Sequence, residues 1–170
     1  MKWIGALLVM IATTWIGFEW SSKFSNRPKQ IRQLKNALQI LEGEILYSQL
    51  PLQEAFFVIS KQIPQPIKHF FQTLAEQMEK NQAAFPLIWE KEVSKLIRHS
   101  YLGKNEGEIL YQFGRSIGQH DFSQQQKHIF LTMSHLDREL QESRDEQLKF
   151  ANMAKSLGLL LGIFIVLVLL

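Results

Sequence analysis

Hydrophobic residues recur at the helical period along most of the chain. The first long stripe steps by three and four residues from Ile31 to Ile45, and a last one begins near Ser123. Shorter stripes of the same period cover 52–63, 67–78, 85–97 and 109–117. No stretch shows the strict alternation of apolar and polar residues that is typical of a strand. The pattern therefore predicts an all-α fold, an antiparallel bundle of about six helices joined by short links.

Proline and glycine mark the expected ends of these helices. Asn26 is a candidate N-cap and Pro28 suits a first helical turn, so we expect the first helix of the bundle to begin there. The glycine-bearing segment 103–107 is expected to be a link, and 118–121 a turn into the last helix. The other prolines, which we interpret as helix starts or breaks, are Pro51, Pro64, Pro66 and Pro86.

The same stripes predict the core of the bundle. In a helix packed on one side of a domain, the apolar stripe faces the interior. The expected core residues are Leu34, Leu38, Leu41, Ile45, Leu52, Phe56, Trp89 and Phe113.

Both ends of the chain are apolar all round, unlike the stripes between them. Residues 156–170 would cover about 22 Å as a helix, and the apolar residues just before them lengthen this toward the ~30 Å of a bilayer core. The segment from Trp3 to Phe18 carries no charge. Alternatives are a buried core helix at the C-terminal end and a cleaved signal peptide at the other, where a small-x-small cleavage pattern is missing. We expect 1–20 and 156–170 to be transmembrane anchors.

Between these anchors, residues 21–155 form one expected domain, whose last helix runs unbroken into the second anchor and includes a polar stalk over 141–149.

Basic residues flank both anchors on their inner sides, which predicts a cytoplasmic middle domain with both termini outside. We interpret this cluster as a membrane-surface and topology signal rather than a nucleic-acid site, because no aromatic residues interleave with it. The expected membrane-surface residues are Lys23, Arg27, Lys29 and Lys155.

Little in the chain points to chemistry. It has no cysteine, which excludes disulfides and thiol catalysis, and its net charge is only +3. Its five histidines include no pair spaced i,i+4, so we expect no metal site. The segment GKNEG from Gly103 lacks the spacing of a P-loop. We therefore expect no enzymatic activity, no cofactor, no small-molecule substrate and no nucleic-acid partner.

Four charged residues of the first long stripe are candidates for binding a protein partner. Glu42 and Glu44 flank the apolar stripe, in positions where coiled-coil helices exchange salt bridges, and Arg32 and Lys35 lie two to three turns before them. The alternative is that the glutamates are an ordinary solvated pair.

Three segments carry a resemblance to a known family. RPKQIRQLKNALQILEGEILYSQLPLQEAF, LGKNEGEILYQFGRSIGQHD and KSLGLLLG resemble the stage III sporulation protein AB family of endospore-forming bacteria, over nearly the whole chain. That family is in turn similar to the cytoplasmic module of the inner-membrane F protein of type II secretion and type IV pilus machines. The shared L-P-L-x-E-A turn corresponds to residues 50–55. F proteins usually carry two such modules, whereas this chain has one.

The resemblance implies a non-enzymatic scaffold in the mother-cell membrane that surrounds the forespore. Such a scaffold would belong to the channel that links the two cells and would dock or couple a secretion-type ATPase and other channel subunits. The residues alone indicate a membrane-tethered helical adaptor. Two alternatives remain open, an enzyme with polar groups that converge on a cavity and a lipid-binding protein that acts on the engulfing membrane through its basic cluster.

Overall fold

The computed structural model describes residues 2–80, 84–117 and 122–169, with side chains at 24–80, 84–117, 124–150 and 153. Over these residues it contains six helices and no strand, which confirms the predicted all-α fold. The helices are α1 (Lys2–Leu46), α2 (Leu52–Gln62), α3 (Ile67–Glu79), α4 (Phe85–Arg98), α5 (Lys104–Ser116) and α6 (Phe122–Leu169).

The chain divides into two compact units, of which unit 1 comprises residues 1–26 and 141–170 and unit 2 comprises residues 27–140. Unit 1 contains the N-terminal part of α1 and the C-terminal part of α6. Within it, the rings of Phe24 and Phe150 stack with their centroids 4.7 Å apart. Most side chains of 141–149, the expected stalk, are exposed, although Ser143 is buried.

The two expected anchors, 1–20 and 156–170, fall on residues whose side chains lie outside the described part, as do Lys23 and Lys155. Among the described residues, no helix has a segment long and apolar enough to cross a membrane.

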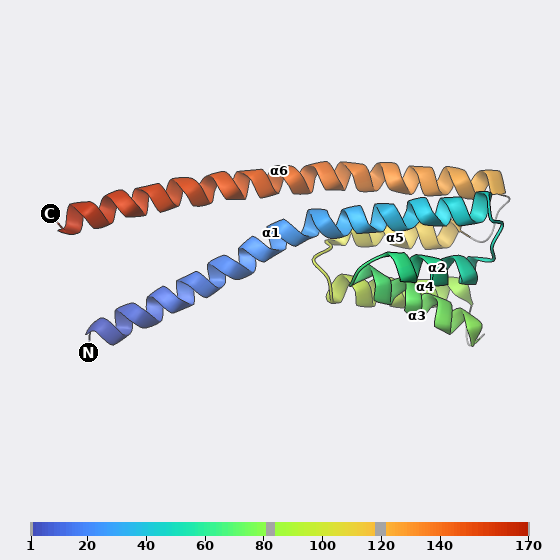
Figure 1. Cartoon of the computed structure of the whole chain (residues 1–170), viewed down its shortest axis with the longest axis horizontal. Coiled ribbons are helices and arrows are strands. Elements are labelled where there is room, and N and C mark those ends of the chain that lie inside the picture. Colours follow the sequence, from blue (N-terminus) through green and yellow to red (C-terminus); the bar gives the residue numbers. More distant parts are fainter. Residues whose placement is uncertain (1, 81–83, 118–121, 170) are drawn as a thin grey trace. The chain divides into compact units, whose positions relative to one another are not determined.

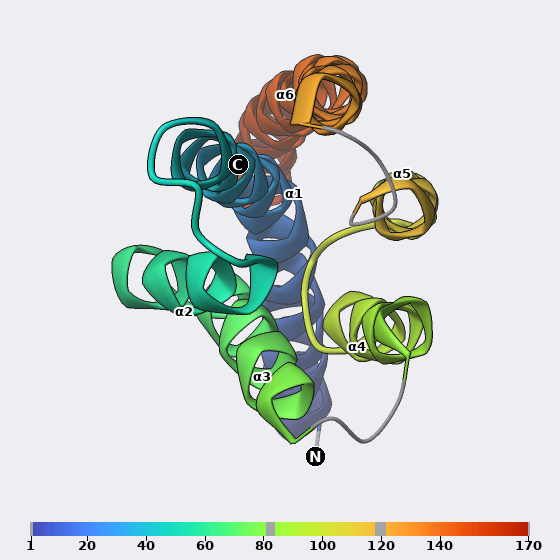
Figure 2. The same cartoon turned by 90° about the vertical axis from the view of Figure 1, so that its right-hand side faces the viewer.

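Unit 2 is the helical bundle. Its successive helices run in alternating directions (Figure 1). Seen from the end, they form a ring in the order α1, α2, α3, α4, α5, α6, which closes where α6 lies beside α1 (Figure 2). This up-and-down arrangement follows from the short links, because a link of a few residues joins helices that are antiparallel neighbours.

Two expected helix boundaries are wrong. Helix α1 passes without a break through Asn26 and Pro28, although proline removes one backbone hydrogen bond and usually costs about 3 kcal/mol inside a helix. Burial of the stripe that follows, from Ile31 onward, offsets this cost. Helix α5 begins at Lys104 rather than after Gly107, because Gly107 packs inside the helix against Ile97.

The apolar stripes meet inside the ring of helices. Seven of the eight expected core residues are buried, and Leu52 is partly buried against the same core. Trp89 lies at its centre, where its indole N–H donates to the Leu110 carbonyl at 2.7 Å. Gly114 makes room for this ring, since a Cβ at that position would lie 2.0 Å from Trp89 Cδ1. Trp89 contacts a group of aromatic rings, Phe56, Phe70, Phe85 and Phe113.

Candidate functional site

Two of the four partner-binding candidates join α1 to α6. The Lys35 ammonium forms an ion pair with the Asp137 carboxylate. Near the end of α1, Glu42 accepts a hydrogen bond of 3.2 Å from the Gln126 side-chain amide. Lys35 and Glu42 therefore already have partners on α6. Substituting either residue would remove a contact between α1 and α6.

The other two candidates, Arg32 and Glu44, are differently placed. Arg32 is exposed and Glu44 is half-buried, and neither side chain forms a hydrogen bond or ion pair with another residue that the structure describes. Both lie on α1, which is buried in the core at Leu34, Leu38 and Leu41.

A buried ionic cluster lies at the start of the bundle, where α1 meets α5 and α6. Arg27 Nε donates to Glu106 Oε1 at 2.9 Å, and its Nη2 donates to Glu139 Oε2 at 3.3 Å. The Asn105 amide also donates to Glu139, at 3.2 Å. The second oxygen of Glu106 accepts the N–H of Gly103, the N-cap of α5, at 2.8 Å.

The side chains of this cluster are largely buried, and their charges compensate one another within the bundle. The side chains of Glu106 and Glu139 are 0% and 3% exposed and that of Arg27 is 14% exposed. Removing a carboxylate from water is costly, and here the guanidinium and several N–H donors compensate. Arg27 was expected at the membrane surface. That expectation is wrong, because its guanidinium is occupied by two buried glutamates of the bundle. Lys29, two residues later, is exposed.

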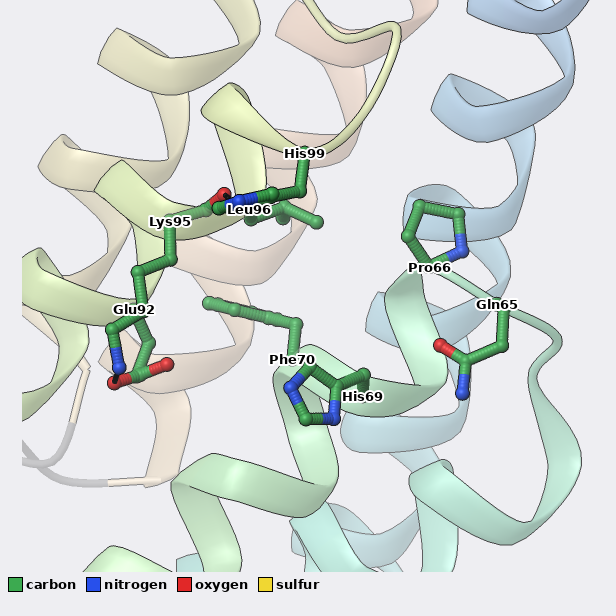
Figure 3. Close-up of a pocket in the computed structure, with 8 residues that line it drawn as sticks. All are labelled: Gln65, Pro66, His69, Phe70, Glu92, Lys95, Leu96 and His99. Carbon is green, nitrogen blue, oxygen red and sulfur yellow. Dashed lines mark hydrogen bonds and ion pairs between the residues drawn. The ribbon is translucent and has the colours of Figure 1, made fainter.

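A groove between α3 and α4 is the second feature that the sequence did not predict (Figure 3). Its volume is about 360 Å³, which falls in the range of ligand pockets. The apolar side chains of Phe70 and Leu96 form part of its lining. Glu92, 4% exposed, belongs to the wall and accepts hydrogen bonds from Lys95 at 2.7 Å and from Gln77 at 2.9 Å. We call this feature the α3–α4 groove.

Two histidines lie on the two sides of this groove, His69 on α3 and His99 just after α4 (Figure 3). His99 Nδ1 lies 2.9 Å from the Lys95 carbonyl oxygen. Because a carbonyl only accepts, Nδ1 carries the proton in this hydrogen bond and Nε2 is left for another partner. Among the described residues, no group of three histidine or carboxylate side chains is placed to hold a metal ion.

Sequence patterns could not have found the groove, since its residues come from two helices and each histidine by itself looks like a solvated surface residue. A signal for the ionic cluster was present in Glu106, which stands at the third position of α5 as in a capping box. The position of Glu106 indicated a cap at the start of α5 but not the contact with Arg27.

Comparisons with known proteins agree on one family. A family model described as stage III sporulation protein AB matches residues 2–170. The chain is 41% identical over 169 residues to stage III sporulation protein AB of Bacillus subtilis (strain 168), covering 99% of each chain. It is also similar to a solved structure of stage III sporulation protein AB (SpoIIIAB), with a TM-score of 0.68, 40% identity and coverage of 73% of this chain and 98% of that chain. These findings confirm the resemblance seen in the sequence.

Proposed function

Because this chain belongs to the stage III sporulation protein AB family, and so has a role in sporulation, we propose that it is a non-enzymatic, membrane-anchored scaffold. It is held in the mother-cell membrane around the forespore, as part of the channel complex that joins the two cells. Its cytoplasmic bundle docks a secretion-type ATPase or another channel subunit.

The apolar ends of the chain support the membrane anchoring. Residues 1–20 and 156–170 are the segments that would span the bilayer, and the basic residues that follow the first segment would stay on the cytoplasmic side. The chain has no cysteine, so single cysteines can be introduced to test this. A cysteine at Lys80 should resist an impermeant thiol reagent in intact cells, while one at Lys2 should react. Labelling at position 80 from outside would contradict the proposed topology.

The observation that carries the docking role concerns Arg32 and Glu44, whose side chains form no hydrogen bond or ion pair with another described residue. They lie on a helix that packs into the core at Leu34, Leu38 and Leu41. Charged groups at a protein interface steer association and select partners, and a reversed charge replaces attraction by repulsion. Docking through Glu44 leaves the Lys35–Asp137 and Glu42–Gln126 contacts intact.

The test is charge reversal with a matched control. Glu44→Lys should leave thermal stability and localisation at the forespore unchanged but reduce the count of heat-resistant spores, because docking fails after engulfment. The control is Glu90→Lys, the same change at an exposed position of α4. Normal sporulation by a stable and localised Glu44→Lys variant would show that this face is not the docking site.

The alternative, a lipid-binding role of the basic cluster, has less support. Arg27 no longer counts among the basic residues that could bind lipid, because its guanidinium is bound to Glu106 and Glu139. Tight binding of the bundle, without its terminal segments, to vesicles that contain anionic lipid would favour this alternative over the scaffold.

A further inference from the structure

The outward side of α6 carries two large apolar side chains that the bundle leaves uncovered. Phe130 is 64% exposed and Leu131 is 42% exposed. The apolar stripe of α6 is turned the other way, because Ile129 and Leu136 are both 0% exposed in the core. A helix that packs on one side of a domain ordinarily shows polar residues on its opposite side. The packing of the bundle therefore does not account for Phe130 and Leu131.

Two cations lie on the same side of α6 as this apolar pair. Side chains three, four or seven residues apart share one side of a helix. By this spacing, five exposed residues form one outward strip, which we call the α6 strip: Lys127, Phe130, Leu131, Ser134 and Arg138. The apolar pair thus lies between a cation one turn before it and a cation two turns after it.

These cations are not neutralised within the described structure. Lys127 forms no side-chain hydrogen bond or ion pair with a described residue. Arg138 is 73% exposed, and its Nη2 lies 4.0 Å from Oε1 of Glu139, a carboxylate that the buried ionic cluster already binds. Within residues 124–140, the one exposed carboxylate is Asp137, and Lys35 binds it. The α6 strip therefore presents a net positive charge.

The neighbouring helix α1 adds exposed charge of the same sign (Figure 2). Within residues 27–46, the exposed charged residues of α1 are Lys29 and Arg32, and neither has a side-chain partner that the structure describes. The unpaired exposed charges of both helices thus favour a negatively charged ligand.

We infer that the α6 strip docks an acidic segment of another protein, with an apolar side chain of that segment against Phe130 and Leu131. Aromatic and arginine side chains are enriched at protein interfaces, and burial of the apolar pair would contribute to binding. Carboxylates of the segment would lie near Lys127 and Arg138, where opposite charges favour association and fix the register. This inference does not depend on the docking role proposed for Glu44.

Two other occupants fit the α6 strip less well. A second copy of the same strip would bring cations against cations, which opposes association. A helix that lies on a membrane buries its apolar face there, whereas α6 buries that face in the core. Phe130 and Leu131 are also successive residues, so their side chains diverge by about 100° around the helix. A protein segment can contact both flanks of a helix, and a flat bilayer cannot.

Site-specific crosslinking in sporulating cells tests this inference. A benzophenone amino acid replaces Phe130 in the full chain, and illumination joins it to the molecule that covers α6. The joined peptide, identified by mass spectrometry, is expected to come from another protein and to contain carboxylates beside an apolar residue. The control carries the same amino acid in place of Phe57, which is 50% exposed on α2, and should not give this product.

Charge reversal tests whether the two cations hold the segment. Lys127→Glu with Arg138→Glu should lower the crosslink yield about tenfold or more, and Lys127→Gln with Arg138→Gln should lower it by a smaller factor. The control, Lys91→Glu with Arg98→Glu, changes the net charge equally at exposed positions of α4 and should leave the yield unaltered. Reversing the carboxylates of the identified segment to lysine should restore the yield of the first variant, which also shows that this variant folds.

The inference is overturned by a crosslink to a second copy of this chain or to a segment without carboxylates. It is equally overturned if the yield ignores the reversals, or if the reversed segment does not restore it. Absence of any protein crosslink at position 130, the result expected if lipid covers the α6 strip, would also contradict it.

Discussion

The two ends of α1 within unit 2 both carry charged residues, but the charges have opposite surroundings. At the start of the unit, Arg27 is bound to glutamates that are 0% and 3% exposed. Near its end, Glu44 is half-buried and has no side-chain partner among the described residues. Between them, Leu34, Leu38 and Leu41 lie in the core.

The comparison shows that charge on a helix does not by itself indicate function. A buried charge that loses its partner destabilises the fold strongly, whereas an exposed charge contributes little to stability and is free to bind a partner. We therefore assign Arg27 to the fold and Glu44 to recognition. The assignment predicts that substitutions along α1 and its partners fall into a graded series of effects.

The largest effect is expected at the buried end. Glu106→Ala removes the carboxylate that Arg27 and the Gly103 N–H share, and it leaves the guanidinium without one of its two buried carboxylate partners. The free energy of unfolding, measured by urea titration, should fall by about 3–5 kcal/mol. Glu108→Ala, two residues later and exposed, should change it by less than about 0.5 kcal/mol.

A second variant at this position sharpens the comparison. Glu106→Gln keeps the shape and one accepting oxygen, so it should lose less stability than Glu106→Ala. Equal losses for both would mean that the charge of Glu106, and not its hydrogen bonding, holds α5 to α1.

The middle of α1 should respond next. Leu38 is 1% exposed, and Leu38→Ala should lower the free energy of unfolding by about 2–5 kcal/mol through lost burial and the remaining cavity. The matched control is Gln39→Ala, on the exposed side of the same turn. A neutral result at Leu38 would contradict the packing of this helix in the core.

A smaller effect is expected where α1 and α6 exchange an ion pair at the surface. Lys35 is 20% exposed and Asp137 is 53% exposed, so solvent screens much of their attraction. Lys35→Ala should cost about 0.2–1 kcal/mol. A double-mutant cycle with Asp137→Ala isolates this pair, and a coupling above about 2 kcal/mol would place it with the buried cluster instead.

The smallest effect on stability is expected at the far end of α1. Glu44→Lys should shift the free energy of unfolding by less than about 0.5 kcal/mol while lowering the spore count. Arg32→Glu, at an exposed residue whose side chain has no partner among the described residues, should behave alike if the partner also contacts this position. Unfolding of either variant would break the comparison, since the residue would then belong to the fold.

Much of the fold could be predicted from the sequence. The apolar period of the stripes indicated the helices, and seven of the eight residues expected in the core are buried. The errors were local. Pro28 and Gly107 were taken as boundary signals, but tertiary packing holds both inside helices, because a single hydrogen bond or a single glycine costs less than the buried stripe contributes.

The candidate sites were harder to predict. Glu42 and Lys35 were expected to bind a partner, which stays a prediction; in the structure they contact Gln126 and Asp137 of α6. The α3–α4 groove was missed altogether. It combines residues from two helices, and no spacing within either helix marks it.

The sequence by itself determined that this chain is helical, where its apolar stripes lie and to which family it belongs. Those properties depend on residues that are close together in the chain or on the order of residues along it. The side chains on one face of a helix, for example, recur every three to four residues. Only the tertiary structure decided which charges are buried and which are free. Arg27 is 79 residues from Glu106 and 112 from Glu139, and charged residues have no period that reveals such partners. Whether a carboxylate is in water or in the core depends on which helices the fold brings together around it.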